Sequence, residues 1–107
     1  MQITEFQNNV YQACKKIPKG RVSTYAEIAS VIRNPASVRA VGNALNKNPF
    51  APEVPCHRVV KSGGMIGGFA SGSRKKIEIL KKEGVMIEKL KIKNFDKVFI
   101  NIKQGGR

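Results

Sequence analysis

Two capping boxes stand close together near the start of this chain and limit what it can fold into. Thr4 is followed three residues later by Gln7, and Thr24 is followed three residues later by Glu27. At this spacing each side chain accepts a hydrogen bond from the other residue's backbone amide in the first turn of an α-helix. The sequence therefore predicts two short helices that begin at about residues 5 and 25.

A third helix is expected directly after the second. Asn34 followed by Pro35 is a typical helix start, because proline fits the first helical position. Apolar residues then recur every three or four positions on one face, and small or polar residues lie elsewhere: Val38, Val41 and Leu45 against Arg39, Asn43 and Asn46. Two short helices joined by a tight turn are the outline of a helix-turn-helix, although many helical hairpins share that outline.

The remaining helices follow from the same periodicity. The first helix carries an apolar stripe that includes Cys14, so we expect Cys14 to be a core residue and not a reactive thiol. A fourth helix is predicted from Ser73 to Glu83. Its buried side would contain Ile77 and Leu80.

Short strands are expected in the second half of the chain. Val59-Val60 and Met65-Ile66 flank a glycine-containing turn, a pattern typical of a small hairpin. Toward the C-terminus, apolar residues alternate with polar ones over residues 89–93 and again over 98–102, on either side of Asn94-Phe95-Asp96. We interpret these two runs as edge strands that lysines protect on the exposed side. The predicted fold class is therefore mostly α with small β elements, ending in a C-terminal β-hairpin.

The chain is strongly basic. It has 20 Lys and Arg against 7 Asp and Glu, which gives a formal net charge of +13. Such an excess usually serves a polyanionic partner, and nucleic acid is the leading candidate. Lysine-rich surfaces of thermophile proteins are an alternative, but those usually balance lysine with glutamate. A membrane-surface role is disfavoured, because no helix pairs a basic face with a wide aromatic one.

The length of 107 residues is enough for one domain. No apolar run approaches the roughly 18 residues that cross a bilayer, and no basic-then-apolar leader follows Met1, so we expect a cytoplasmic protein without membrane contact. Cys14 and Cys56 cannot form a disulfide framework, and a zinc site is disfavoured because His57 is the only histidine. We expect neither a metal nor a cofactor.

The stretch Pro55-Cys56-His57-Arg58-Val59-Val60 is the candidate for chemistry. A thiolate is the reactive form of cysteine and a free thiol has a pKa near about 8.5, so a catalytic cysteine needs a base or a cation nearby. His57 and Arg58 offer both. Because neighbouring side chains diverge, we expect His57 to reach the sulfur through a bridging water. Spacing alone leaves open that the dipeptide is an accident of a loop.

Four further segments accompany residues 55–60 at fixed spacings: Gly20-Arg21-Val22-Ser23-Thr24-Tyr25, Arg39-Ala40-Val41-Gly42, Asn48-Pro49 and Glu83-Gly84. Together they resemble the O6-alkylguanine-DNA alkyltransferases, the methylated-DNA–protein-cysteine methyltransferases. The resemblance covers about residues 6–85. We expect residues 1–107 to form a single catalytic and DNA-binding domain, with residues 86–107 as a C-terminal extension and without the α/β domain that typical members place ahead of it.

The resemblance implies a winged helix-turn-helix that presents its recognition helix to the minor groove of DNA. Arg39 would fill the space in the base stack left by an extruded nucleotide, while Ala40 and Gly42 would allow close backbone approach. Tyr25 would help to rotate the nucleotide and would donate its hydroxyl to guanine N3. Cys56 would then attack the alkyl carbon on O6.

The same resemblance implies supporting roles. His57 would remove the thiol proton through water, and Glu83 would hold and polarise that histidine. Asn48 would brace the active-site turn. Backbone carbonyls of Cys56 and Val59 would accept hydrogen bonds from the guanine amino group.

A loop that contains Phe69, Ala70 and Ser71 would line the pocket. Many family members carry tyrosine and serine where this chain has Phe69 and Ala70. Phe69 keeps a stacking surface, whereas Ala70 loses a side-chain donor. The preferred size of the alkyl group therefore stays open.

The function implied is single-turnover repair: a monomer transfers an alkyl group irreversibly from O6 of guanine in double-stranded DNA to Cys56, at the nucleoid. The alternative is a non-catalytic lesion sensor like the alkyltransferase-like proteins, which replace the nucleophile by another residue. Cys56 separates these two hypotheses. A winged-helix transcription factor would leave the Cys56-His57 stretch unexplained, and a cysteine hydrolase would need a second histidine as its base.

Overall fold

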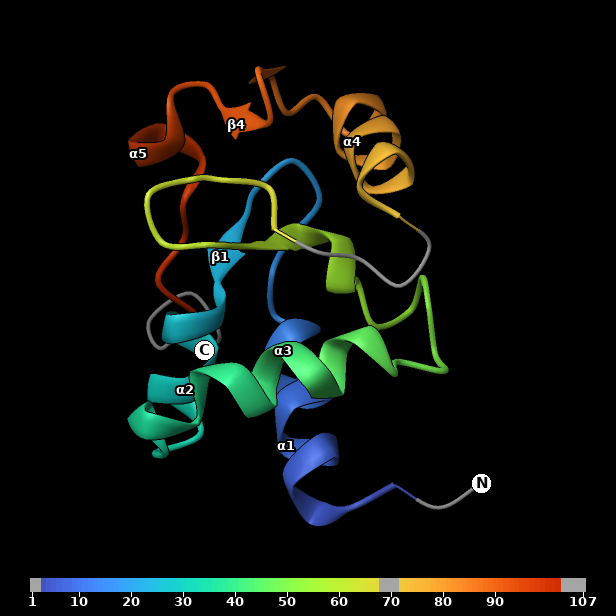
Figure 1. The fold of residues 1–107 in the computed structure, drawn as a ribbon, viewed down its shortest axis with the longest axis vertical. Helices are drawn as coiled ribbons and strands as arrows, with labels where there is room; N and C mark the ends of the chain where they lie inside the picture. The colour runs from blue at the N-terminus through green and yellow to red at the C-terminus, as the bar shows by residue number, and fades with distance from the viewer. Residues whose placement is uncertain (1–2, 68–71, 103–107) are drawn as a thin grey trace.

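Short helices and even shorter strands alternate along the chain (Figure 1). The computed structural model describes residues 3–67 and 72–102. In chain order the elements are α1 (Glu5–Cys14), β1 (Ser23–Thr24), α2 (Tyr25–Val31), η1 (Pro35–Ser37), α3 (Val38–Asn46), η2 (Cys56–Arg58), β2 (Val59–Val60), α4 (Ser73–Lys82), β3 (Ile87–Glu88), β4 (Lys91–Ile92) and α5 (Phe95–Val98), where η denotes a 3₁₀ turn. The predicted fold class, mostly α with small β elements, is confirmed.

Both predicted capping boxes mark real helix starts, although only the first forms both of its hydrogen bonds. Thr4 Oγ1 accepts from the amide of Gln7 at 3.0 Å, and Gln7 Oε1 accepts from the amide of Thr4 at 2.9 Å. At the start of α2, Thr24 Oγ1 accepts from the amide of Glu27 at 3.0 Å. Both predicted helices therefore begin where the sequence places them.

The third helix begins later than its proline signal indicates. Residues Pro35–Ser37 form a 3₁₀ turn, and α3 starts only at Val38. The amide and the hydroxyl of Ser37 both donate to the carbonyl of Asn34, at 2.9 and 2.6 Å, which holds the chain in this tighter turn. The turn joins α2 to α3, and the two helices pack against each other and against α1.

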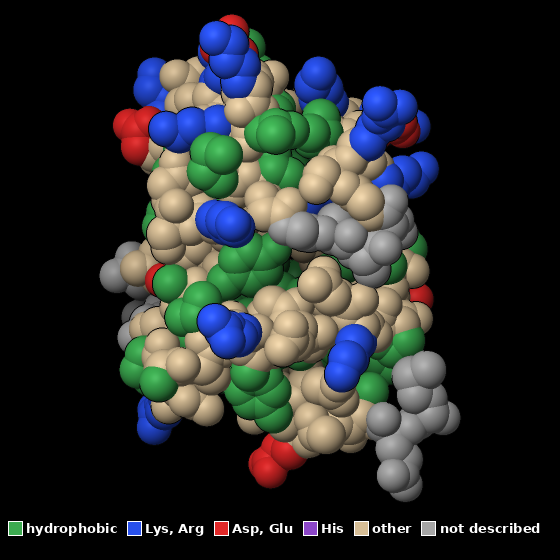
Figure 2. Space-filling view, in the orientation of Figure 1, with side chains coloured by type: hydrophobic (Ala, Val, Ile, Leu, Met, Phe, Trp, Pro, Cys, Tyr) green, Lys and Arg blue, Asp and Glu red, His purple; other side chains and the backbone are tan. Residues whose placement is uncertain are grey.

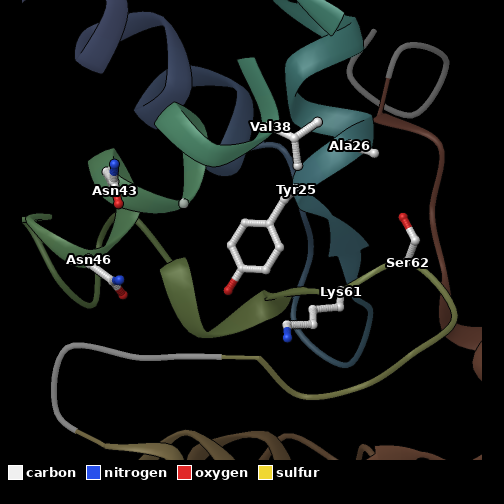
Figure 3. Close-up of a pocket in the computed structure, with 8 residues that line it drawn as sticks. Tyr25, Ala26, Val38, Asn43, Asn46, Lys61 and Ser62 are labelled. Atoms are coloured by element: carbon white, nitrogen blue, oxygen red, sulfur yellow. The ribbon is translucent and has the colours of Figure 1, made fainter. Parts of the chain in front are cut away.

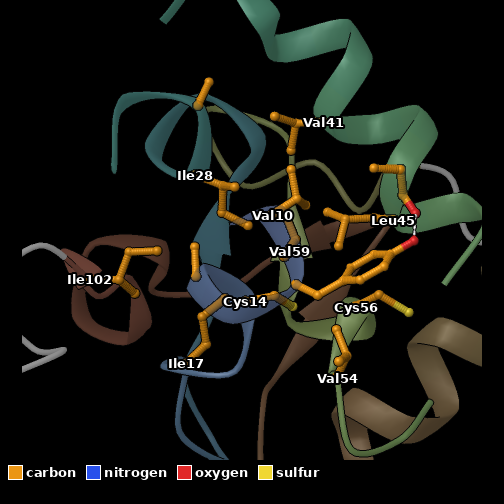
Figure 4. Close-up of a cluster of buried hydrophobic side chains, with 14 residues drawn as sticks. Val10, Cys14, Ile17, Ile28, Val41, Leu45, Val54, Cys56, Val59 and Ile102 are labelled. Carbon is orange, nitrogen blue, oxygen red and sulfur yellow. Dashed lines mark hydrogen bonds between the residues drawn. The ribbon is translucent and has the colours of Figure 1, made fainter. Parts of the chain in front are cut away.

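The three N-terminal helices enclose the first of two apolar clusters (Figure 4). Val10 and Cys14 of α1 and Val41 of α3 are fully buried in it, and Tyr11 donates its hydroxyl to the carbonyl of Ala44 at 2.8 Å. Ile102, close to the C-terminus, is buried in the same cluster. The buried side of α3 thus faces α1, and its other side is left to solvent.

A second cluster lies between α4 and the C-terminal segment: Val22, Val60, Ile66, Leu80, Val85 and Ile92. Strand β2 joins the two clusters, because Val59 belongs to the first and Val60 to the second. Both valines are fully buried. The turn that carries Cys56 therefore lies at the junction of the two clusters.

The expected hairpin between residues 59–60 and 65–66 is wrong. Strand β2 pairs in parallel with β1, in the register Ser23↔Val59 and Thr24↔Val60. The intervening turn exists, since the amide of Lys61 donates to the carbonyl of Met65 at 2.9 Å, but Met65 bridges to Lys91. A strand buried on both faces has the unbroken apolar character of a parallel strand, which the local pattern did not distinguish from a hairpin arm.

The C-terminal hairpin lies earlier than predicted. Strands β3 and β4 pair antiparallel around Lys89 and Leu90, whose φ angles are 51° and 64°. Residues 95–98, expected in part as the turn, form α5. The alternation over residues 98–102 reflects a different partner: the amide of Ile100 donates to the carbonyl of Val22 at 2.9 Å, and the amide of Val22 donates to the carbonyl of Val98 at 3.0 Å. This segment docks beside β1 and does not form a hairpin arm.

None of the helices in the described part of the chain has the length and apolar character that a bilayer span requires.

Candidate active site and nucleic-acid interface

Cys56 opens the 3₁₀ turn η2 and lies at the edge of the first apolar cluster. Figure 4 shows its sulfur directed away from the packed side chains, and 6% of the residue is exposed. Its amide donates to the carbonyl of Val54 at 2.8 Å. Cys14, by contrast, is fully buried, and burial raises the pKa of its thiol, with Cys56 as a smaller contributor. The prediction that Cys14 is a core residue is confirmed.

His57 is held by a carboxylate from the far end of α4. Its Nε2 lies 2.9 Å from Oε2 of Glu83, the residue that caps the C-terminus of α4. Arg58 binds the same carboxylate with two donors, Nε to Oε1 at 3.0 Å and Nη2 to Oε2 at 2.8 Å. A third donor, Nη1, reaches the carbonyl of Ile17 at 2.8 Å. One arginine therefore fixes both carboxylate oxygens and ties α4 to the turn after α1.

The contacts among His57, Arg58 and Glu83 determine the charge states of His57 and Glu83. Burial acts to raise the pKa of Glu83, but hydrogen bonds from Arg58 and His57 outweigh it and hold that pKa below its usual value. Burial lowers the pKa of His57, against the pull of Glu83. Glu83 is thus a carboxylate that accepts from Nε2–H of a neutral imidazole. Nδ1 of His57 is left as the proton acceptor.

Asn48 lies on the proline-rich loop that leads to Cys56. Its Nδ2 donates to the carbonyl of Val54 at 2.8 Å, and its Oδ1 accepts from the amide of Phe50 at 2.9 Å. The Val54 carbonyl also accepts from the amide of Cys56. Asn48 and the cysteine backbone therefore share one acceptor, which couples the position of the loop to that of the thiol.

Lys76 of α4 lies fully buried next to Tyr25 and Val59, two residues that the sequence proposes for substrate contact. Its Nζ donates to the carbonyl of Val59 at 2.6 Å and to the hydroxyl oxygen of Tyr25 at 3.3 Å. The same nitrogen lies 5.6 Å from the centroid of the tyrosine ring. Burial lowers the pKa of Lys76 to about 8 and raises that of Tyr25 to about 12. Sequence reasoning missed Lys76, although its position four residues before Leu80 places it on the buried side of α4.

Gly67 allows the tyrosine hydroxyl to lie where it does. Its φ is +76°, and a Cβ there would be 3.2 Å from Tyr25 Oη. Both its backbone conformation and this close approach favour glycine.

The exposed face of α3 borders a pocket of about 400 Å³, whose wall is Tyr25, Ala26, Val38, Gly42, Asn43, Asn46, Lys61 and Ser62 (Figure 3). Tyr25 points between α3 and the turn that carries Lys61. Arg39 and Ala40 are exposed on the same helix, and Gly42 is half-buried. Gly42 and Tyr25 thus line one opening, and Arg39 and Ala40 lie on the helix that borders it.

Phe69, Ala70 and Ser71 fall outside the described residues. Among the residues that are described, no group of three or more His, Cys, Asp and Glu is arranged to hold a metal ion.

Basic side chains surround the same face of the molecule (Figure 2). Lysine and arginine lie over α3, beside the central hollow and along the edge formed by α4, β4 and α5, and acidic side chains appear along that edge and at the rim of the view. A surface of this kind attracts the phosphates of nucleic acid.

Residues 5–85 match the sequence model of the 6-O-methylguanine DNA methyltransferase DNA-binding domain. A methylated-DNA–protein-cysteine methyltransferase of Methanosarcina acetivorans is 53% identical over 81 residues, which are 76% of this chain and 52% of that protein. The chain thus spans about half the length of the curated relatives it matches.

Solved structures agree on the fold. Mycobacterium tuberculosis OGT in complex with DNA is 41% identical with a TM-score of 0.74, over 77% of this chain and 51% of that one. S. pombe Atl1, in complex with damaged DNA containing O6-carboxymethylguanine, is 35% identical with a TM-score of 0.80, and the match covers 94% of this chain and 98% of that one.

Proposed function

This chain belongs to the 6-O-methylguanine DNA methyltransferase family through its DNA-binding domain, and on that basis we propose that it repairs alkylated DNA by moving an alkyl group from O6 of guanine to Cys56. The transfer happens once per molecule, because a thioether has no easy chemical exit. The substrate is double-stranded DNA with an O6-alkylguanine. The protein acts as a monomer in the cytoplasm, at the nucleoid, and requires no cofactor.

One observation carries the proposal. The scarcely exposed thiol of Cys56 stands beside a histidine that Glu83 holds in one orientation, and Arg58 in turn fixes the carboxylate of Glu83. A thiol that is scarcely exposed is suited to accept a group from a bound substrate and is poorly suited to react with solutes in bulk solution.

The proposed chemistry starts with proton removal. The thiol proton of Cys56 passes through a water molecule to Nδ1 of His57, and the carboxylate of Glu83 stabilises the imidazolium that forms. The thiolate then attacks the methyl carbon in line. A sulfur–carbon bond forms as the carbon–O6 bond breaks, and the electron pair of the broken bond stays on the guanine.

Tyr25 neutralises the departing base. Its hydroxyl donates a proton to N3 of guanine, and the ammonium of Lys76, which donates to the tyrosine oxygen, polarises that hydroxyl and replaces the proton it loses, so that Lys76 ends neutral. Because Lys76 also holds the carbonyl of Val59, the same ammonium orients an acceptor for the guanine amino group. Arg39 on α3 occupies the place of the extruded nucleotide in the duplex.

A lesion sensor is the second candidate. The match to Atl1 extends over nearly the whole of both chains, whereas the matches to methyltransferases stop at about half of those proteins. Cys56 favours the repair activity, because a sensor needs no nucleophile.

Intact-mass measurement separates the two. The protein is incubated with a duplex that carries a single O6-methylguanine. We expect a gain of one methylene equivalent per molecule, and no gain in the Cys56→Ala variant, which still binds the duplex. A wild-type protein that binds the lesion at unchanged mass is a sensor.

A further inference from the structure

The hairpin β3–β4 and the residues that flank it, 87–93, form a basic projection that the repair mechanism does not use. We propose that this projection is a wing, which binds the phosphate backbone of duplex DNA beside α3. The inference rests on the proposed function only in taking DNA as the partner.

The wing is joined by hydrogen bonds to the wall of the candidate site. The amide of Ile66 donates to the carbonyl of Leu90 at 3.0 Å, and the amide of Ile92 donates to the carbonyl of Gly64 at 2.9 Å. Strand β4 therefore lies between β3 and the chain that follows the turn with Lys61 and Ser62. Since Lys61 and Ser62 line the pocket beside α3, the wing continues the edge of that pocket.

The wing has a buried residue at its base and exposed lysines on its surface. Ile92 is 3% exposed in the second cluster, while Lys91 and Lys93 on either side of it are exposed. Lys89 is exposed at the tip of the hairpin, in the left-handed conformation. Ile92 thus points inward and the lysines toward solvent, while the apolar Leu90 at the tip is also exposed.

The charge balance of the surrounding surface favours an anionic partner. Glu88 stands opposite Lys91 in the hairpin register, so one carboxylate offsets part of the wing's charge. Lys97 on α5 and Lys81 and Lys82 at the end of α4 are exposed and add positive charge, which the exposed Asp96 on α5 and Glu78 on α4 offset only in part. Figure 2 shows basic side chains along this edge in the same view that presents the hollow and α3.

Phosphate is the anion that this arrangement fits best. Lysines spaced along an exposed strand are point charges on flexible stems, and such groups contact a nucleic-acid backbone without reading its sequence. Anchoring on the pocket wall would place these contacts on the strands next to the extruded nucleotide.

Salt titration of binding tests the wing. Affinity for a duplex with one O6-methylguanine is measured over a range of KCl concentrations, in a Cys56→Ala background so that no transfer occurs. The test variant is Lys89→Gln/Lys91→Gln/Lys93→Gln. The matched control is Lys15→Gln/Lys16→Gln/Lys19→Gln, which removes the same charge from exposed positions at the end of α1 and in the turn that follows it. Helix α1 packs against the side of α3 that is turned away from solvent.

We expect the slope of log affinity against log salt to become shallower by about 2 to 3 in the wing variant, since each phosphate contact contributes about 0.9. The control should change the slope by less than about 1. Equal slopes in the wing variant and the control variant would overturn the proposal that the wing binds DNA.

The outcome is independent of the repair activity. In the Cys56-containing versions, methyl transfer from the free base O6-methylguanine reports the active site without DNA, and we expect both lysine variants to match the wild type. A shallower slope in a protein that never gains mass would support the wing and refute the repair function. If the wing variant keeps the wild-type slope and the Cys56-containing protein does gain mass, the wing is refuted and the repair function is supported.

Discussion

Lys76 is the residue whose environment departs most from that of a typical lysine. It is fully buried, and burial lowers its pKa to about 8 from an ordinary 10.5. The unfolded chain therefore binds more protons than the folded one between about pH 8 and pH 10.5, so this group's contribution to stability grows as pH rises through that window. At neutral pH the protein keeps a costly buried cation, which points to a role other than stability.

The Lys76→Met substitution tests that role through the pH profile of single-turnover transfer. In the wild type we expect the rate to fall as pH rises above about 8, because the ammonium that polarises Tyr25 is lost. Tyr25 itself, with a pKa raised to about 12, does not titrate in that range. The variant should be slower at pH 7 by about 10- to 100-fold, the worth of a charged hydrogen bond, and should lack the alkaline decline.

Lys75→Met is the control, because Lys75 is the exposed neighbour on the same helix. It should keep both the rate and the decline. If Lys76→Met still slows above about pH 8, another group titrates and the role assigned to Lys76 is wrong.

Local sequence points to the candidate reactive residues more directly than to the residues that contact them. Cys56 and His57 are adjacent in the sequence, so a local motif is enough to single them out. Glu83 came from family resemblance, and the binding of its carboxylate by Arg58 could not be foreseen, because that contact joins residues 25 positions apart. Lys76 was missed because it ends the basic run Arg74-Lys75-Lys76, and such a run is typical of a solvent-exposed helix face.

At the scale of elements, α3 carries a glycine that the fold does not demand. A Cβ at Gly42 would meet the ring of Tyr25 at 3.9 Å, which is ordinary contact. Alanine is also the better helix former by about 1 kcal/mol. The glycine is therefore best explained by what approaches the exposed side of the helix.

Gly42→Ala should accordingly raise stability and lower function. We expect the free energy of unfolding to rise by roughly 0.5–1 kcal/mol in a denaturant titration. Transfer from duplex DNA should slow about tenfold or more, because the added methyl group occupies the pocket wall, whereas transfer from the free base should change less. An unchanged rate on duplex DNA would show that backbone approach at this position is unimportant.

Helices were predicted more accurately than strands for a physical reason. Caps and periodicity are local, so α1, α2 and α4 begin close to where the sequence places them. Strand partners are not local: β2 pairs with β1, and residues 99–100 dock beside Val22. An alternating pattern reports that a segment is extended with one side buried, and it does not report what lies beside it.

At the scale of the whole molecule, the C-terminal segment is part of the core. The family match ends at residue 85, yet Ile92 and Ile102 beyond it are buried in the two different apolar clusters. Arg21 reinforces the closure by donating to the carbonyls of Val98 and Phe99 at 3.1 and 3.2 Å. The segment that closes the fold also carries the basic wing, so stability and DNA contact share one element.

The most direct test of the account is to locate the methyl group after reaction. The protein is exposed to duplex DNA with a single O6-methylguanine, digested, and its peptides are mapped by mass spectrometry. The account predicts one methyl group on the peptide that contains Cys56, none on the peptide that contains Cys14, and the same result in a Cys14→Ala variant. A methyl group on Cys14, or on neither cysteine after complete binding, would contradict it.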